Sequence, residues 1–321
     1  MTIDSDVSTK KALVLSGGGS KGAVQVGMAM RLFQEGFKPD FVAGVSVGAL
    51  NGFFLAQHKP DLLYNLWKNI KSSDDVYRSR WLTLGLGLIG WQWGYPSIYK
   101  PGPIKKLIRK HVKATKPEDF KAEFRCGTVN LRDGEYVVAH QGSDYLGRMM
   151  AGSMSIPIVF PPVPVCERRS FLGFLRRTEP KPVDGCDLFV DGCVRANSPI
   201  SDAIDYGADE IHVLQTGGTT LHRMDGDFMS FIDIISRTIE IMLHQKLVDD
   251  IKGVLVRNDL AAATEGSVYR HVKLYVYEPE DAVTQGCLDF DQQAIQECID
   301  LGYELGRYPK DNNQLASWFG T

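Results

Sequence analysis

Two short units, each an apolar strand, a glycine turn and a helix, follow one another within the first 55 residues. In the first unit the strand 11–15 leads into Gly17-Gly18-Gly19 and a helix expected over residues 21–35. In the second, the strand 41–45 leads into Ser46 and the helical stretch SVGALNGFFLA. Successive strand–turn–helix units predict a parallel sheet, so the fold class indicated is α/β.

The rest of the chain continues this pattern. Helices are expected over residues 61–71, 103–112, 228–252 and 291–305, and strands over 124–131, 135–140, 188–190, 211–215 and 272–277. Arg132-Asp133-Gly134 predicts a hairpin between two of these strands. No internal repeat or long low-complexity linker divides the chain. We therefore expect a loose tail at residues 1–10 and a single domain over 11–321, with inserted loops.

Composition excludes some classes of protein. The net charge of −3 gives no general attraction to nucleic acid or to an anionic membrane, and no nucleic-acid partner is expected. No apolar run reaches the roughly 18 residues that span a bilayer, and residues 1–11 lack the apolar core of a signal peptide. The six cysteines include no C-x-x-C pair. This pattern predicts reduced thiols, no metal site and a cytoplasmic protein.

The first glycine turn raises the question of a dinucleotide cofactor. Gly17, Gly19 and Gly22 have the spacing G-x-G-x-x-G. A dinucleotide site also needs an acidic residue at the end of the second strand, about 20 positions on, whereas Asp40 precedes that strand. A phosphate-binding G-x-x-x-x-G-K-[ST] loop is absent from the sequence. The context argues against a nucleotide, and no cofactor is expected.

The second turn has the sequence G-x-S-x-G, formed by Gly44, Ser46 and Gly48. At a strand-to-helix turn this pattern predicts a nucleophile elbow, in which a tight bend exposes the serine hydroxyl above the sheet. The alternative is a glycine-rich turn with an incidental serine. The strand before it and the helix after it favour the nucleophile.

A serine nucleophile gives the first turn a role. Acyl transfer builds an oxyanion that backbone N–H groups can stabilise. Gly17, Gly18 and Gly19 offer such donors at the start of a helix. Two adjacent parallel strands would place both turns at the same edge of the sheet.

The base for Ser46 is less evident. None of the seven histidines sits in a recognisable motif, although His222 lies in a plausible loop. Asp191 is the better candidate, because it follows the apolar strand 188–190 and Gly192 permits a turn directly after it. Asp184, also followed by glycine, is a rival that lacks the preceding strand.

Four blocks in order resemble the patatin-like phospholipase family. Residues 17–22, GGGSKG, resemble its oxyanion loop, and residues 44–48 resemble its nucleophile elbow. Residues 153–157 with the following FPP resemble its A-S-x-x-x-P stretch, and Asp191-Gly192 resembles its D-G-[GA]. The resemblance covers residues 11–200. Two positions depart from the pattern: Cys193 stands in place of Gly or Ala, and Gly152 in place of Ala.

The resemblance implies a three-layer α/β/α fold with a mainly parallel central sheet. It also implies a Ser–Asp dyad without histidine, in which Ser46 is the nucleophile and Asp191 the base. The supporting motif residues would be Lys21, Gly22, Gly44, Gly48 and Gly192. The implied activity is that of a lipid acyl hydrolase of the phospholipase A type. It would cleave carboxylic esters of membrane lipids through an acyl-enzyme, without metal or cofactor.

Two further stretches bear on contact with a membrane. Residues 81–95 carry no charge and contain Trp81, Trp91 and Trp93, so they predict either a buried segment or an interfacial patch. Residues 166–182 combine apolar residues with Arg168, Arg169, Arg176 and Arg177. This second stretch is either a solvated hairpin or a contact with anionic head groups, which would make the protein peripheral on membranes.

Two other functions remain compatible with these motifs. One is a soluble carboxylesterase, thioesterase or acyltransferase on the same fold. The other, of a different class, is a nucleotide-binding regulatory module that keeps the glycine loop without hydrolysis. The sequence does not indicate an oligomeric state.

Overall fold

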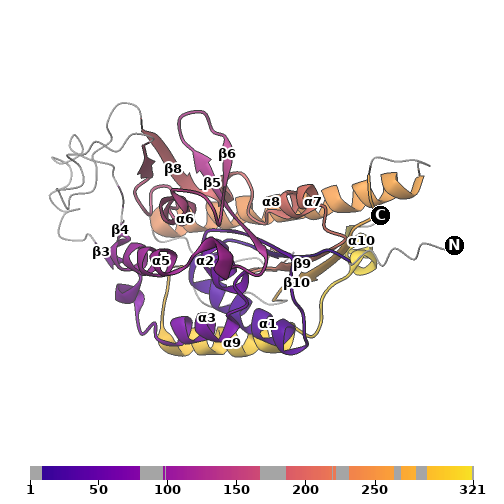
Figure 1. Cartoon of the computed structure of the whole chain (residues 1–321), viewed down its shortest axis with the longest axis horizontal. Helices are drawn as coiled ribbons and strands as arrows, with labels where there is room; N and C mark the ends of the chain where they lie inside the picture. Colours follow the sequence, from indigo (N-terminus) through magenta and orange to yellow (C-terminus); the bar gives the residue numbers. More distant parts are fainter. Residues whose placement is uncertain are drawn as a thin grey trace.

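The computed structural model describes residues 9–79, 97, 99–166, 186–218, 220–221, 231–263, 269–279 and 288–319. Several predictions fall outside these residues: the first eight residues of the expected tail, Trp81, Trp91, Trp93, Arg168, Arg169, Arg176, Arg177, Asp184 and His222. Figure 1 shows a central sheet with helices on both faces.

The sheet has eight strands in the order β10-β9-β1-β2-β5-β8-β7, with β6 also paired to β5. Its strands are β1 (Lys11–Leu15), β2 (Phe41–Val45), β5 (Glu123–Asn130), β6 (Tyr136–His140), β7 (Val163–Val165), β8 (Asp187–Asp191), β9 (Glu210–Leu214) and β10 (Lys273–Tyr277). The five strands from β10 to β5 are parallel, and β6, β7 and β8 add antiparallel pairs. This confirms the α/β class and the mainly parallel sheet.

The helices form two layers. On one face lie α1 (Gly22–Gln34), α2 (Val47–Leu55), α3 (Pro60–Lys68), α5 (Gly102–Ala114), α6 (Leu146–Ser153) and α9 (Gln292–Leu305). On the other lie α7 (Ile200–Tyr206), α8 (Phe231–Ala263) and α10 (Asn312–Phe319). Short 3-10 turns lie at Gly19–Lys21, Ser73–Asp75, Pro117–Asp119 and Gly192–Val194, and β3 (Arg78–Ser79) pairs with β4 (Tyr99–Lys100).

Strand β1 explains how one sheet serves two cores. Leu13 and Leu15 are buried in the cluster under α1 and α2, whereas Ala12 and Val14 are buried in the cluster under α7 and α8. Because successive side chains of a strand point to opposite faces, a strand covered on both faces must be apolar throughout. The apolar run ALVL that follows Lys11 therefore corresponds to a central parallel strand.

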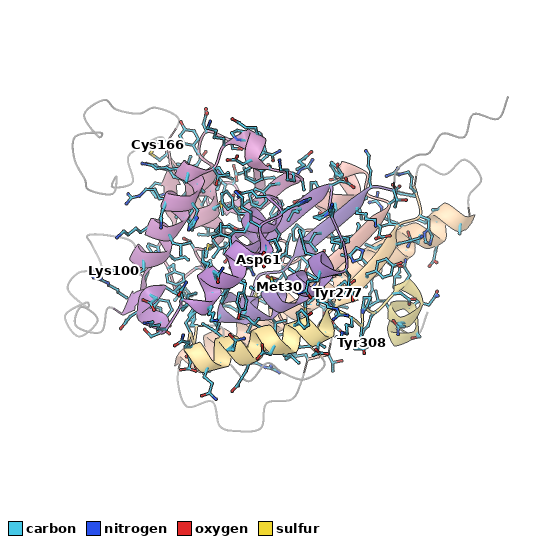
Figure 2. All side chains as sticks on the ribbon, turned by 60° about the horizontal axis from the view of Figure 1, so that its bottom comes forward. Met30, Asp61, Lys100, Cys166, Tyr277 and Tyr308 are labelled. Carbon is cyan, nitrogen blue, oxygen red and sulfur yellow. A yellow bond between two sulfur atoms is a disulfide. The ribbon has the colours of Figure 1, made fainter. Side chains whose placement is uncertain are left out.

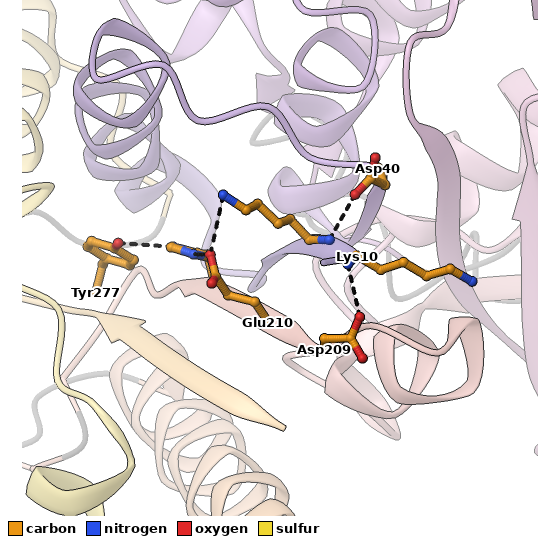
Figure 3. A network of polar contacts seen from close by, with 7 residues as sticks. Lys10, Asp40, Asp209, Glu210 and Tyr277 are labelled. Carbon is orange, nitrogen blue, oxygen red and sulfur yellow. Dashed lines mark hydrogen bonds and ion pairs between the residues drawn. The ribbon is translucent and has the colours of Figure 1, made fainter. Parts of the chain in front are cut away.

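Polar side chains tie neighbouring parallel strands together, through Asp40 and Asp209 at the amino ends and through His212 in the middle of β9 (Figure 3). Asp40 accepts a hydrogen bond of 2.8 Å from the N–H of Lys11, and Asp209 accepts one of 2.9 Å from the N–H of Lys10. His212 bridges Glu210 at 2.8 Å and the Tyr277 hydroxyl at 3.0 Å. Asp40 therefore joins β1 and β2 at the edge opposite the glycine turn, too far from that turn to hold a ribose.

The prediction that all cysteines are reduced is wrong for one pair. Cys166 and Cys186 form a disulfide, with their Cα atoms 4.4 Å apart. Val165 of β7 pairs with Asp187 of β8, so the two cysteines are the next residues beyond that antiparallel pair. A sequence separation of 20 gives no sign of this, because the antiparallel pairing of β7 and β8 brings them together. Cys166 and Tyr308 lie at opposite ends of the molecule (Figure 2).

Most predicted elements lie within a few residues of the observed ones, and the antiparallel hairpin of β5 and β6 is confirmed. The predicted helix 228–252 extends much further, as α8, to Ala263. The pattern did not predict α6, α7, α10 or β7. Within the described residues, no helix combines the length and the apolar character that crossing a bilayer requires.

Candidate active site

The two glycine turns meet at the carboxyl edge of the sheet. Strands β1 and β2 are parallel neighbours, with Leu15 paired to Gly44, so the turns that follow them emerge side by side. A Cβ atom at Gly17 would lie only 3.1 Å from the Cβ of Ser46. The expected juxtaposition of the two turns is therefore confirmed.

Ser46 sits in a strained turn between β2 and α2. Its backbone has φ 57° and ψ −128°, an unusual conformation for a residue other than glycine. The chain can bend this sharply because Gly48 packs directly on the end of β1, where a Cβ would lie 2.4 Å from the carbonyl oxygen of Leu15. Gly44 cannot carry a side chain either, because a Cβ there would lie 2.3 Å from the carbonyl oxygen of Gly48. This is the geometry of a nucleophile elbow.

The end of α6 connects the serine turn to the strand that carries Asp191. The hydroxyl of Ser153 accepts a hydrogen bond of 2.9 Å from the N–H of Ser46. Two residues later, the carbonyl of Ser155 accepts one of 3.0 Å from the N–H of Asp191. Ser153 is fully buried and Ser155 nearly so. The S-M-S-I-P block thus fixes the relative position of Ser46 and Asp191.

Asp191 ends β8 and is completely buried. Its Oδ1 accepts a hydrogen bond of 3.0 Å from the N–H of Cys193, while its Oδ2 has no hydrogen-bond partner among the described residues. Burial raises the pKa of Asp191 to about 6, although contacts with the N–H of Cys193, the Ser46 hydroxyl and the Cys193 thiol lower it. Asp191 is therefore a stronger base than an exposed aspartate, and its Oδ2 is free to accept a proton.

The first glycine turn is held from two sides. The N–H of Gly17 points to Asn197, whose carbonyl and side-chain oxygens both lie 3.2 Å away. The hydroxyl of Thr216 donates to the carbonyl of Gly17 at 2.6 Å. By contrast, the hydrogen bonds of the described residues include none from the N–H of Gly18 or Gly19. Those two groups remain available as donors to an anion.

The supporting motif residues pack around these turns. A Cβ at Gly22 would lie 2.5 Å from Val47, and one at Gly192 would lie 2.5 Å from the carbonyl oxygen of Gly127. Lys21 forms an ion pair of 3.4 Å with Glu240 of α8. Gly152, one of the two departures from the family pattern, is also explained, because a Cβ there would lie 2.9 Å from the Cβ of Phe189.

An apolar pocket opens at Ser46, with a cavity volume of about 60 Å³. Its lining residues are Gly19, Ser46, Val47, Leu50, Leu66, Trp67, Ile70, Asp75, Val76, Ile104, Leu107, Met154, Ile156, Phe160, Leu288 and Phe290. Only Ser46 and Asp75 bring polar side chains, and the Asp75 carboxylate accepts a hydrogen bond from the N–H of Lys71 at 2.9 Å. Such a pocket suits a hydrocarbon chain.

A buried polar network stabilises the wall of this pocket. The indole N–H of Trp67 donates to Asn51 at 2.9 Å, and the Asn51 amide donates to Gln25 at 2.9 Å. Gln25 in turn donates to the carbonyls of Ser16 and Leu214, at the carboxyl ends of β1 and β9. The orientation of Trp67 is thus coupled to the strands that carry the glycine turn.

No histidine lines the pocket within the described part of the chain, and His212 lies in the middle of β9, paired with Leu13 of β1. The described residues also contain no group of three or more His, Cys, Asp or Glu side chains able to hold a metal ion. The geometry therefore brings Ser46, Asp191 and the glycine turn together without a histidine among these residues.

Sequence reasoning did not identify the roles of Ser153, Asn197 and Thr216. One signal was available for Thr216, which follows β9, a parallel neighbour of β1, and so must emerge at the same edge. Ser153 lay inside a recognised block without an assigned role. Asn197 follows the Asp191 turn in an irregular segment, and no pattern in the sequence indicates its contact with Gly17.

Comparison with models of known protein families identifies the family of this chain. The family model named patatin-like phospholipase matches residues 13–204, which contain both turns, the S-M-S-I-P block and Asp191. The chain belongs to the patatin-like phospholipase family.

Curated relatives match the chain with modest identity. A lysophospholipase nte1 of Aspergillus terreus is 30% identical over 162 residues, covering 50% of this chain and 10% of that protein. A lysophospholipase NTE1 of Pyricularia oryzae is 26% identical over 307 residues, covering 92% of this chain and 18% of that protein. The chain thus spans less than a fifth of the length of these relatives.

Two solved structures resemble the fold. VipD from Legionella pneumophila has a TM-score of 0.41 and 12% identity, covering 96% of this chain and 67% of that chain. Human GIVD cytosolic phospholipase A2 has a TM-score of 0.43 and 10% identity, covering 97% and 61%. The family assignment rests on the sequence match.

Proposed function

We propose that this protein is a lipid acyl hydrolase that cleaves carboxylic esters of membrane lipids. One observation carries the proposal: Ser46, in a strained turn, opens onto an apolar pocket beside a buried carboxyl group with a free oxygen. The pocket would hold the acyl chain and thereby place its ester carbonyl at Ser46. Membership of the patatin-like phospholipase family supports this assignment.

In the proposed mechanism, Asp191 Oδ2 takes the proton of the Ser46 hydroxyl as Oγ attacks the ester carbonyl carbon. The N–H groups of Gly18 and Gly19 stabilise the oxyanion, while Gly17 holds the loop through Asn197. Collapse of the intermediate breaks the ester bond, and the departing alcohol receives the proton from Asp191. A water molecule then attacks the acyl-enzyme, giving its proton to Asp191, and the proton returns to Ser46 as the fatty acid leaves.

The substrate proposed is a phospholipid or lysophospholipid in a membrane, and the protein would act as a peripheral protein at that surface. The names of the relatives favour a lysophospholipid, which carries a single acyl chain. The arginine and tryptophan segments expected to contact the membrane, the cytoplasmic location and the single domain over 11–321 stay predictions.

The test combines active-site labelling with acyl release. A fluorophosphonate probe should label the wild type and fail to label Ser46→Ala, while Ser201→Ala, an exposed serine of α7, should label normally. Ser46→Ala and Asp191→Asn should each lower fatty-acid release from lysophosphatidylcholine micelles about a thousandfold or more, because the two groups act as a unit. Asp300→Asn, at an exposed position of α9, is the matched control.

Other results would redirect the assignment. Labelling that persists in Ser46→Ala, or near-normal turnover in Asp191→Asn, would contradict the dyad. Hydrolysis of p-nitrophenyl butyrate without release from micelles or phosphatidylcholine vesicles would indicate a soluble esterase. Specific binding of NAD or ATP without any ester hydrolysis would favour the regulatory module.

A further inference from the structure

Helix α5 is apolar on its inner side and basic on its outer side. Ile104 and Ile108 are buried, and Ile104 and Leu107 line the pocket at Ser46. On the other side of the helix, four exposed basic side chains occupy positions i, i+3, i+4 and i+7, which lie along one side of a helix. These four residues, the basic face, are Lys106, Arg109, Lys110 and Lys113.

The basic face has no acidic partner among the described residues. None of its four side chains forms an ion pair there, and the next ion pair along the chain joins Lys116 to Glu118, beyond the end of the helix. Like charges three and four residues apart repel each other and destabilise a helix. Just before α5, Lys100 of β4 is paired with Arg78 of β3, which again sets two positive charges side by side. This arrangement favours an anionic partner from outside the chain.

The positive charge belongs to this part of the chain alone. Residues 76–117 contain nine Lys and Arg and none of the 39 Asp and Glu, although the whole chain has a net charge of −3. Lys100, in this stretch, lies at the same end of the molecule as Cys166 (Figure 2). An anionic surface is therefore attracted to one end of the molecule rather than to the protein as a whole.

We propose that the basic face docks the protein on an anionic lipid surface. The inference rests on the proposed function, because it assigns the side of the lipid hydrolase that meets its substrate. The pocket favours a lipid over other anions, since Ile104 and Leu107 of the same helix line an apolar cavity at Ser46. A surface held by the basic face lies about 10 Å from that cavity, the diameter of one helix.

Other partners fit these features less well. A second copy related by a two-fold axis would set one basic face against another, with like charges opposed. Nucleic acid would supply phosphates but makes no use of an apolar cavity beside the contact. Because the apolar side of α5 packs inside the protein, the contact with lipid is electrostatic and involves no insertion of the helix. It should therefore weaken as the salt concentration rises.

The first test measures binding of the full chain to vesicles by co-sedimentation at physiological salt, with Ser46→Ala in every protein so that no lipid is hydrolysed. The Ser46→Ala protein should bind phosphatidylcholine–phosphatidylserine vesicles much more tightly than pure phosphatidylcholine vesicles. Replacing all four residues of the basic face by Gln should weaken binding to the anionic vesicles about a hundredfold or more, because each basic residue near such a surface contributes about fivefold.

A matched control removes the same number of positive charges at exposed positions away from α5. Three of these positions lie near the amino ends of β1, β2 and β10, and one follows α9. The four substitutions are Lys10→Gln, Lys38→Gln, Lys273→Gln and Arg307→Gln. This control should bind within about threefold of the Ser46→Ala protein, because charges more than about 8 Å from the surface are screened. Equal losses in the two variants, or no binding of the Ser46→Ala protein to anionic vesicles, would overturn the proposal.

The second test separates docking from chemistry. With Ser46 intact, the basic-face variant should release fatty acid from the anionic vesicles far more slowly than the wild type. Its turnover of p-nitrophenyl butyrate should be unchanged, because none of the four side chains lines the pocket. Loss of both activities would mean that these side chains shape the pocket, which contradicts the docking role. A wild type that binds the vesicles but hydrolyses neither substrate would contradict the proposed function and leave the docking surface intact.

A third measurement compares lipid with nucleic acid. The Ser46→Ala protein should bind a short DNA duplex much more weakly than the anionic vesicles. Tight binding to the duplex that the four Gln substitutions abolish, without binding to vesicles, would assign the basic face to a phosphate backbone and overturn the lipid surface.

Discussion

The Asp191 carboxyl is completely buried, with one oxygen accepting a hydrogen bond from the N–H of Cys193 and the other without a partner among the described residues. Such burial penalises the charged form, so the group is tuned toward accepting a proton at the expense of stability near neutral pH. Asp191 is thus the residue at which the proposed chemistry and the stability of the fold oppose each other.

Replacing Asp191 by Asn should therefore stabilise the protein at pH 7.5. The folded-state pKa is raised to about 6, so the native state binds a proton more tightly than the unfolded chain. The stability this provides is present below pH 4 and is lost as the pH rises through 6. Asp191→Asn should then be more stable than the wild type by roughly 2 to 3 kcal/mol at pH 7.5 and about equal at pH 4. Urea unfolding at both pH values measures this, and equal differences at the two would contradict the burial argument.

Cys193 should set the acid limb of the pH profile. Its thiol contacts Asp191 and lowers the pKa of that carboxyl. Cys193→Ala removes this contact, so the pKa should rise and kcat/KM for a soluble ester should begin to fall at a higher pH. Cys193→Ser keeps a donor and should leave the limb near that of the wild type. Cys298→Ala, at a buried position of α9, is the control, and a uniform loss at every pH in Cys193→Ala would point to a structural role only.

At the scale of elements, the two strand–turn–helix units determine where the site lies. Gly48 packs α2 against the end of β1, and this close approach sets the position of Ser46. The contact is with backbone, which cannot move aside as a side chain can. The strained turn therefore depends on a glycine whose neighbours belong to a different strand.

Gly48→Ala should destabilise the fold strongly. Its Cβ would lie 2.4 Å from the carbonyl oxygen of Leu15, so a loss of about 3 kcal/mol or no folded protein is expected. Gly52→Ala in the same helix would meet side-chain atoms at 3.2 Å or more, and stability should change by about 1 kcal/mol or less. Urea midpoints and soluble-ester turnover compare the two variants. Similar midpoints would contradict the role given to the close contact.

Some of these elements and contacts can be predicted from the sequence, and others cannot. The apolar pattern of the strands, the spacing of the glycines and the parallel pairing of successive strands suffice to predict β1 and β2. They also predict that Gly17 lies beside Ser46, because each of these features follows from local geometry. The contact of Ser153 with the N–H of Ser46 joins residues 107 apart in the chain, and only tertiary packing decides it. Helix α6 contains two glycines and starts without a capping side chain, which weakens its local signal.

For the whole molecule, the two edges of the sheet have different tasks. The carboxyl edge carries Ser46, Asp191 and the pocket, while the amino edge is tied by Asp40 and Asp209. The disulfide between Cys166 and Cys186 lies on the antiparallel side, next to the strand that ends at Asp191. It closes a loop around residues 167–185, so it should act mainly on the unfolded chain.

Reduction of this disulfide should lower stability while turnover survives. With a sequence separation of 20, the chain-entropy estimate gives a loss of about 3 kcal/mol. Ester hydrolysis should persist, because β8 stays paired with β5 through the contact of Thr128 with Asp191. Urea unfolding with and without a reductant measures the loss, and a double variant with serine at positions 166 and 186 should match the reduced wild type and ignore the reductant. Identical midpoints for the wild type in both conditions would mean that the two thiols are not joined in solution.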